Sequence, residues 1–219
     1  DGLVMCADCR MWYPVVDGLL ELLVGALAYR QDRLDFASAH ADAIRALGLD
    51  PEQGSEQDQA VDLQLQQQKH FDWYASNATQ TYSAYERTPF WVAADRIAFD
   101  AWRQEIQPGK RLMDIGCAQG RSTFKVMDLD LQVIGIDVSK SLVRQALERY
   151  RQGNYRARAT FIVADAHDLP LVDNAGDYII IYGVLHHLPD PQRTCREVAR
   201  VLKPGGVYFG SENNHSVFR

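Results

Sequence analysis

The chain has 219 residues, of which 47% are hydrophobic, and its 29 acidic and 23 basic side chains give a formal net charge of −6. This length allows one or two domains with a well-buried core, and the negative charge argues against a nucleic-acid partner. The apolar stretch over residues 18–29 is shorter than the ~20 residues of a membrane span, and no secretory signal is evident. The sequence therefore predicts a cytoplasmic protein without a membrane span.

Two of the four cysteines, Cys6 and Cys9, form a C-x-x-C pair near the start of the chain. This is the spacing of one zinc knuckle, which is half of a tetrahedral site. The surrounding sequence, LVMCADCRMWYPVVDGLLELL, resembles the second half of a small zinc-ribbon domain. The resemblance implies a partial zinc-ribbon-like segment over residues 1–24, with Cys6 and Cys9 as a metal half site. We expect zinc only in a longer form of the protein that supplies further ligands.

Residues 25–88 are expected to form a helical connector and lid. A helical pattern of apolar residues runs through residues 20–47 and stops near Gly48. The Gln-rich residues 57–68 are typical of a solvated helix or connector. Aromatic side chains then become frequent, and those expected to belong to a lid or substrate pocket, or alternatively to the core, are Tyr74, Tyr82, Tyr85 and Trp91.

Strands and helices alternate from Thr88 onward. Thr88 and Pro89 open a predicted helix to Ile106, whose expected apolar face contains Phe90, Ala94, Ile97 and Ala101. A short strand leads into Asp114, a helix is predicted to begin at Ser122, and another extends from Pro191 to Lys203, with Asp190 as its N-cap. The further predicted strands are residues 132–137, 160–166, 177–183 and 206–212. This order predicts an α/β fold with a doubly wound, Rossmann-like, mostly parallel sheet and helices on both faces.

The loop after the first of these strands, within LMDIGCAQG at residues 112–120, is the clearest functional signal. Gly116 can adopt backbone angles closed to other residues, and Gly120 has no side chain to obstruct a ligand. Asp137 ends the next strand, and its carboxylate suits the two hydroxyls of a ribose. An ordinary turn and a helix-capping aspartate explain each feature alone, but the pair favours a nucleotide-like ligand.

Polar residues also follow the later strands. Asp165 ends the third strand, and His186 and His187 follow the fourth. In an open parallel sheet, ligands bind at the carboxyl ends of the strands, so these side chains are expected to share one crevice.

From about residue 110 to 212 the chain resembles a class I S-adenosylmethionine-dependent methyltransferase of the type 11-like subgroup. Five signatures of that family occur in order, at Asp114–Gly120, Asp137, Ala164–Ala166, Val184–Leu188 and Leu202–Gly206. One position departs from the pattern, because Ala118 replaces the usual second glycine. We expect cofactor binding to survive this change, with altered loop geometry. Zinc ribbons of the kind noted above are often attached to methyltransferases.

The resemblance implies roles for individual residues. Asp137 would bind the ribose, Asp165 the adenine amino group, and the backbone of Ala166 the adenine ring nitrogen. The methionine part would lie against Gly116 to Ala118. The full set of expected cofactor-binding residues is Asp114, Gly116, Cys117, Ala118, Gly120, Asp137, Val138, Asp165, Ala166 and Tyr182.

The expected activity is methyl transfer from S-adenosylmethionine to a small-molecule acceptor. His186 and His187 are candidate general bases, although they also fit a role in capping the loop beside the cofactor. Two alternatives stay open. A nicotinamide-dependent oxidoreductase would require three glycines in its loop, where this chain has Gly116 and Gly120. A non-catalytic cofactor-binding module is the other.

Two further expectations concern packing. The methyltransferase domain, assigned to residues 89–219, is expected to be incomplete at its C-terminus, because residues 207–210 would form an apolar sheet edge. We expect that edge to be covered by further strands of a longer protein, by a partner, or by the N-terminal region. Cys117 and Cys195 are expected to be small buried hydrophobic residues.

Overall fold

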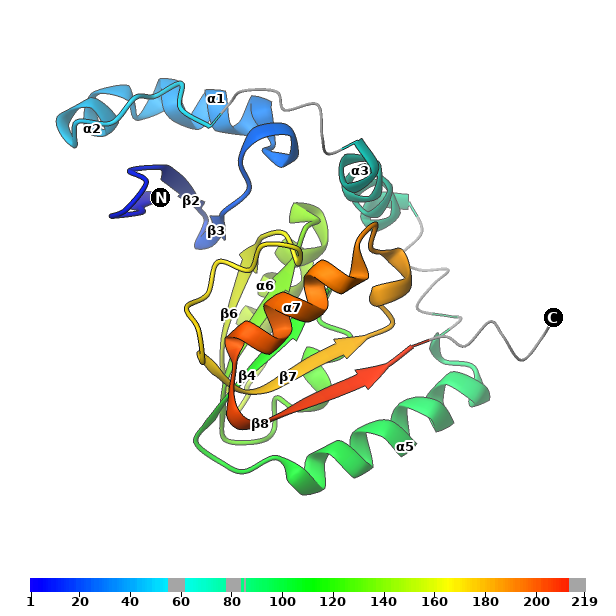
Figure 1. Cartoon of the computed structure of the whole chain (residues 1–219). Helices are drawn as coiled ribbons and strands as arrows, with labels where there is room; N and C mark the ends of the chain where they lie inside the picture. The colour runs from blue at the N-terminus through cyan, green and yellow to red at the C-terminus, as the bar shows by residue number, and fades with distance from the viewer. Residues whose placement is uncertain (55–61, 78–83, 85, 213–219) are drawn as a thin grey trace.

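The computed structural model describes residues 1–54, 62–77, 84 and 86–212. Within these residues the protein has one eight-stranded sheet with the strand order β1-β2-β3-β6-β5-β4-β7-β8 (Figure 1). Strands β3 to β8 pair in parallel, and β1 and β2 extend the sheet as an antiparallel hairpin. The strands are β1 (Gly2–Met5), β2 (Trp12–Val16), β3 (Leu19–Glu21), β4 (Lys110–Ile115), β5 (Leu131–Asp137), β6 (Arg158–Val163), β7 (Gly176–Tyr182) and β8 (Leu202–Ser211).

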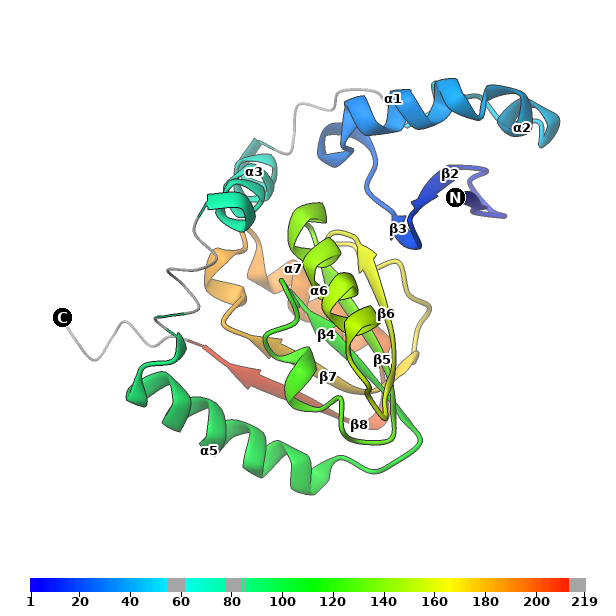
Figure 2. The ribbon, with the colours of Figure 1, turned by 180° about the vertical axis from the view of Figure 1, so that it is seen from behind.

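Helices cover both faces of this sheet, so the predicted α/β class is confirmed. Helix α7 lies on the face toward the viewer in Figure 1, and α6 lies on the face shown in Figure 2. Among the described residues, none of the helices combines the length and apolarity needed to cross a membrane. The helices are α1 (Arg30–Ala39), α2 (Ala41–Ala46), α3 (Asp62–Asn77), α5 (Pro89–Glu105), α6 (Lys140–Gln152) and α7 (Pro191–Val201), with 3-10 turns η1 (Gly25–Leu27), η3 (Thr123–Lys125) and η4 (Leu185–His187).

Alternation along the strands divides the core between the two faces. In β4, Met113 and Ile115 pack in one cluster with Val198 of α7. Leu112 points to the other face and packs in a cluster with Phe99 of α5. Side chains of a strand alternate between faces, so a single apolar strand supports both helical layers.

Helix α7 begins as predicted but turns Cys195 away from the core. The side chain of Asp190 accepts a hydrogen bond from the backbone N–H of Arg193, and Pro191 occupies the first turn. The buried residues are Thr194, Val198 and Val201, whereas Cys195 is exposed. The expected burial of Cys195 is therefore wrong, because the helix turns its Thr194 side toward the sheet.

Helix α5 has the predicted limits and the opposite orientation. Phe90 and Ile97, expected in the core, are 72% and 71% exposed, whereas Phe99 is 4% exposed. The ring of Trp102 stacks on Phe209 of β8 with centroids 5.5 Å apart. Aromatic residues lie on both sides of this helix, and contacts with the sheet determine which side is buried.

The helix predicted after the glycine loop is a single 3-10 turn, Thr123–Lys125. The hydroxyls of Ser122 and Thr123 donate hydrogen bonds to the carboxylate of Asp114, which hold this segment against β4. The chain then returns to the sheet at Leu131. It thus turns back before a longer helix forms.

The N-terminal region differs most from the sequence expectation. Leu20 and Glu21, expected to begin a helical segment, belong to strand β3, and Leu20 pairs in parallel with Ile162 of β6. The N-terminal hairpin therefore extends the β6 edge of the sheet. The expectation that it could cover residues 207–210 is wrong, since β8 lies at the opposite edge.

Candidate functional site

A cavity of about 390 Å³ lies at the carboxyl ends of the central parallel strands, with residues of α3 forming part of its wall. Its lining includes most of the cofactor-binding residues expected from the sequence and both candidate bases. These residues are Gly116, Cys117, Ala118, Asp137, Val138, Asp165, Ala166, Tyr182, His186 and His187.

Asp114 and Gly120 lie outside this lining and have structural contacts instead. Asp114 is fully buried and accepts hydrogen bonds from Ser122 Oγ at 2.7 and 2.9 Å and from Thr123 Oγ1 at 2.5 Å. Burial raises the pKa of Asp114 to about 6, although these hydroxyls oppose the shift. A Cβ on Gly120 would lie 2.2 Å from the ring of Phe124. Both residues therefore determine the conformation of the loop without lining the cavity.

Two residues of the glycine loop have left-handed backbone angles. Gly116 has a φ of +74°, and a Cβ there would lie 2.4 Å from Val184. Ala118 has a φ of 46°, which is uncommon for a residue with a side chain. Cys117, between them, is fully buried as predicted. The substitution of Ala for the usual glycine thus preserves a backbone conformation that glycine adopts more readily.

Asp137 is held by backbone amides on both sides. Its Oδ1 accepts from the N–H of Ser139 at 2.9 Å, and its Oδ2 accepts from the N–H of Ala118 at 2.9 Å. Burial raises the pKa of Asp137 to about 6, against the lowering effect of these two hydrogen bonds. Each carboxylate oxygen can accept a second hydrogen bond, so the group can still bind a ligand hydroxyl.

Asp165 contacts a helix that sequence reasoning did not connect with the site. Its Oδ1 accepts from the N–H of His167 at 2.9 Å, and its Oδ2 accepts from Nε2 of Gln64 at 3.1 Å. Gln64 lies on α3, within the segment expected to be a solvated helix or connector. The described part of that segment is helical, but it is not solvated on all sides, because Gln68 is buried.

Helix α3 contributes one wall of the cavity. Phe71 packs edge-on against His187, with ring centroids 5.2 Å apart. Tyr74 lines the cavity and so does Trp91 of α5, as the lid expectation requires, whereas Tyr82 and Tyr85 lie outside the described residues. The α3 residues in the lining are Gln64, Gln67, His70, Phe71 and Tyr74.

His186 forms a pair with Glu212, which the sequence did not single out. Nδ1 of His186 lies 2.7 Å from Oε2 of Glu212. The other oxygen of Glu212 accepts from the N–H groups of Val184 and Leu185 at 2.9 and 2.8 Å. Burial opposes ionisation of Glu212, but these hydrogen bonds hold its pKa below its ordinary value. Burial and the neighbouring His186 lower the pKa of His187.

A buried carboxylate supports two side chains of the cavity wall. Asp95 of α5 accepts a hydrogen bond from the hydroxyl of Tyr182 and forms ion pairs with Arg121 at 3.2 Å and Lys125 at 2.8 Å. Arg121 also pairs with Glu86 at 3.0 Å. Burial opposes ionisation of Asp95, but the bonds from Lys125 and Tyr182 lower its pKa. This network fixes two cavity-lining side chains, those of Tyr182 and Arg121.

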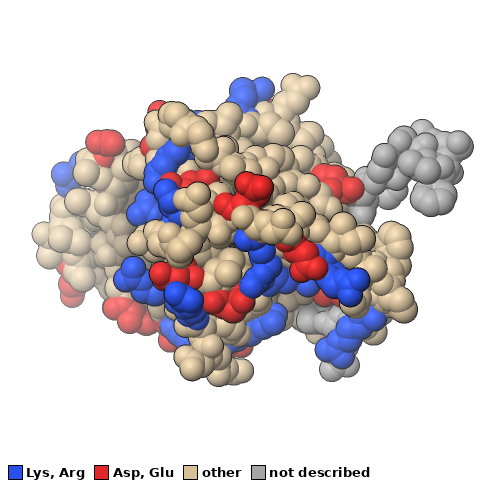
Figure 3. Space-filling model, turned by 90° about the horizontal axis from the view of Figure 1, so that it is seen from below, with Lys and Arg blue, Asp and Glu red and all other residues tan. Residues whose placement is uncertain are grey.

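Charge and cysteine positions bear on the remaining expectations. On the face shown in Figure 3, basic and acidic side chains are interleaved.

Cys6 and Cys9 lie at the turn between β1 and β2, where hydrogen bonds from Cys9 and from the backbone of Asp8 lower the pKa of Cys6. Within the described residues, no group of three or more His, Cys, Asp or Glu side chains could hold a metal ion.

Comparison with known proteins identifies the fold and a domain. Residues 113–210 match the family model described as a methyltransferase domain. The 27-O-demethylrifamycin SV methyltransferase of Amycolatopsis mediterranei is 37% identical over 102 residues, which are 46% of this chain and 38% of that protein. Methyltransferase GfsG of Streptomyces halstedii is 33% identical over 120 residues, 54% of this chain and 43% of that protein. The chain thus spans less than half the length of these curated relatives.

Solved structures agree on the architecture. The crystal structure of the cyclase SpnF has a TM-score of 0.60 and 29% identity, and the match covers 70% of this chain and 64% of that one. Together the comparisons support the resemblance to class I methyltransferases and give no support to a nicotinamide-dependent oxidoreductase. The zinc-ribbon resemblance of residues 1–24 stays a prediction.

Proposed function

We propose that this chain binds S-adenosylmethionine and transfers its methyl group to a small-molecule acceptor. One observation carries the proposal: Asp137 and Asp165, at the ends of the neighbouring strands β5 and β6, line the same cavity as the left-handed turn at Gly116. Two acids and a close-approach loop at the carboxyl edge of a parallel sheet suit a nucleoside with a polar tail.

The residues present fit this cofactor. The cavity volume of about 390 Å³ lies in the range of small-molecule sites, about 300–1,000 Å³. Asp137 would hold the ribose hydroxyls, and Asp165 with the backbone of Ala166 would hold the adenine. Gly116 to Ala118 and Tyr182 would line the methionine part. When bound, the cofactor supplies a methyl carbon activated by a sulfonium, so the chain has to orient, desolvate and deprotonate the acceptor.

His186 is the proposed base. Glu212 accepts a hydrogen bond from Nδ1 of His186, which leaves Nε2 as the nitrogen that takes a proton from the acceptor. Because the lowered pKa of Glu212 keeps it ionised, it also stabilises the imidazolium that results. His187, with its lowered pKa, stays neutral beside it and packs against Phe71.

The test separates binding from chemistry, since the relative SpnF is named a cyclase. Calorimetry with S-adenosylhomocysteine is expected to give a saturable site, and NAD to give none. Methyl transfer from labelled cofactor is then measured on a panel of small hydroxylated and amine acceptors. Cofactor binding without methyl transfer to any acceptor would refute the proposed activity and favour a non-catalytic cofactor-binding module. An absence of cofactor binding would refute the whole proposal.

A matched variant tests the base. His186→Gln is expected to lower kcat by about 10²–10⁴-fold with little change in cofactor affinity. His70→Gln, another histidine of the cavity wall, serves as the control. Equal losses of kcat in the two variants would contradict the assignment of His186.

We also propose that Cys6 and Cys9 supply half of a zinc site whose other ligands lie outside this sequence. The C-x-x-C spacing and the lowered pKa of Cys6 support the proposal, because zinc binds the thiolate form. Metal analysis of a longer form that contains the upstream residues is the test. An absence of zinc there, with Cys6 and Cys9 reduced, would contradict it.

A further inference from the structure

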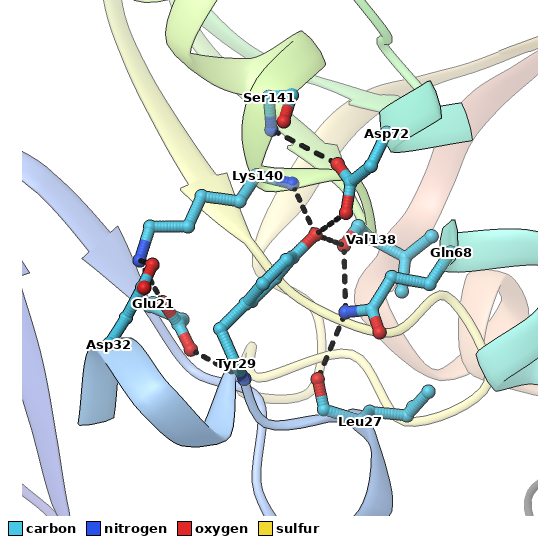
Figure 4. Close-up of polar contacts among 9 residues, drawn as sticks. All are labelled: Glu21, Leu27, Tyr29, Asp32, Gln68, Asp72, Val138, Lys140 and Ser141. Atoms are coloured by element: carbon cyan, nitrogen blue, oxygen red, sulfur yellow. Dashed lines mark hydrogen bonds and ion pairs between the residues drawn. The ribbon is translucent and has the colours of Figure 1, made fainter. Parts of the chain in front are cut away.

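The loop that follows Asp137 is contacted by two segments that lie outside the matched methyltransferase region. Figure 4 shows Tyr29, just before α1, and Asp72 of α3 converging on residues 138–141. This loop ends β5 and starts α6. Its position decides where the carboxylate of Asp137 lies, because the N–H of Ser139 is bonded to that carboxylate.

Tyr29 and Asp72 cap the N-terminus of α6 from outside the helix. The hydroxyl of Tyr29 donates to Oδ2 of Asp72 at 2.7 Å and accepts from the backbone N–H of Lys140 at 2.8 Å. Oδ1 of Asp72 accepts from Oγ of Ser139 at 2.6 Å and from the N–H of Ser141 at 3.3 Å. The first amides of a helix have no partner within it, so these two side chains satisfy donors that would otherwise be left unbonded.

Charged and amide side chains reinforce the same junction. Nζ of Lys140 lies 2.8 Å from the carboxylate of Glu21 and 2.6 Å from that of Asp32. Nε2 of Gln68 donates to the carbonyl of Leu27 at 2.9 Å and to that of Val138 at 3.4 Å. The N-terminal region and α3 are thus tied to the loop by side chains that, apart from the exposed Asp32, belong to buried or half-buried residues.

We propose that Tyr29 and Asp72, which we call the latch, are positioning residues for the cofactor site. Neither lines the cavity. They act through residues 138–141, which they hold in the geometry that presents Asp137 to the ribose. The inference rests on the proposed function, and it gives residues before the methyltransferase region a role in cofactor affinity. A preorganised loop binds more tightly because less conformational entropy is lost on binding.

The test compares Tyr29→Phe and Asp72→Asn with two matched controls. Tyr178→Phe removes a buried phenol that bonds Glu105 and Gln107, and Asp128→Asn removes the ion pair with Arg103; neither position lines the cavity. The Kd of S-adenosylhomocysteine is expected to rise about tenfold in each latch variant and to stay unchanged in the controls. Where turnover is measurable, KM for the cofactor rises and kcat does not fall in proportion.

Hydrogen exchange supplies a reading that does not depend on the cofactor. The amides of Lys140 and Ser141 are expected to exchange faster in the latch variants, and those of β5 to remain protected. Unchanged affinity in both latch variants, or an equal loss in the controls, would overturn the inference. If the wild-type chain binds no S-adenosylhomocysteine, the proposed function fails and the affinity claim fails with it. If the wild-type chain binds S-adenosylhomocysteine and both latch variants bind it with the same Kd, the latch is contradicted and the proposed function is not.

Discussion

The backbone N–H of Ala118 donates a 2.9 Å hydrogen bond to Oδ2 of Asp137. This bond joins the glycine loop after β4 to the acid after β5, two strands that pair in parallel. The bond also fixes which carboxylate lone pairs face the cavity. The loop and the acid, which the sequence presents as separate motifs, therefore form one unit.

The first prediction concerns the acid. Asp137→Ala removes a charge-assisted contact to the ribose, and we expect a loss of about 1.5–3 kcal/mol, or roughly ten- to a hundredfold in the affinity for S-adenosylhomocysteine. Calorimetry measures this loss. The change is expected to leave the sheet intact, which far-ultraviolet circular dichroism checks. Unaltered binding in a folded variant would be incompatible with a ribose contact at Asp137.

The second prediction concerns pH. Burial raises the pKa of Asp137 to about 6 in the free protein. Only the ionised carboxylate accepts two ribose hydroxyls, so affinity is full above this pKa and falls as the pH drops through it. The ionised fraction falls about tenfold between pH 7 and pH 5, and Kd should rise by the same factor. Asp137→Asn should bind weakly and with a flatter pH profile, whereas an equally steep profile in that variant would assign the effect to another group.

The third prediction concerns the left-handed residue of the glycine loop. At the φ of 46° found for Ala118, a residue with a Cβ is strained by about 1 kcal/mol. Ala118→Gly removes this strain, but glycine loses more conformational entropy on folding than alanine does. The net expected increase in the free energy of unfolding is therefore only about 0.5 kcal/mol. Denaturant unfolding measures this. Ala146→Gly inside α6 is the control and should destabilise by about 1 kcal/mol.

The fourth prediction concerns the carboxylate behind Tyr182. Asp95→Asn leaves Arg121 and Lys125 without their shared buried partner, and we expect a loss of about 3 kcal/mol in the free energy of unfolding. Asp128→Asn, at an exposed ion pair, should cost less than about 1 kcal/mol. The lowered pKa of Asp95 means that its contribution is present at neutral pH and is lost as the pH falls through that pKa. Equal costs at the two positions would show that the network adds nothing.

The sequence was most informative where the signal is local. The central strands are rich in apolar residues, and Asp137 directly follows the run at residues 133–136, so β5 and its acid were both predicted. Helix α5 shows the limit of this reasoning. It was predicted with the right ends, but Phe90 and Phe99 are equally good core candidates until the sheet is in place.

Contacts between distant residues could not be predicted in this way. Gln64 meets Asp165 across 101 positions, and Glu212 meets His186 across 26. In the sequence, Gln64 is one of several glutamines in a polar stretch, and no periodic pattern distinguishes it. The signal that could have indicated Glu212 is its place as the last residue of the predicted strand 206–212, at the same sheet edge as Asp137 and Asp165.

The parallel pairing of β3 with β6 has a practical consequence for anyone who prepares this protein. A fragment that begins at Pro89 would keep all of β4 and the methyltransferase match but would lose the strand that covers β6. The N–H and C=O groups of Ile162 and Val163 that face β3 would then be unpaired and could bond a strand of another molecule. Such a fragment should self-associate, whereas a version that retains residues 19–21 keeps this edge of β6 paired.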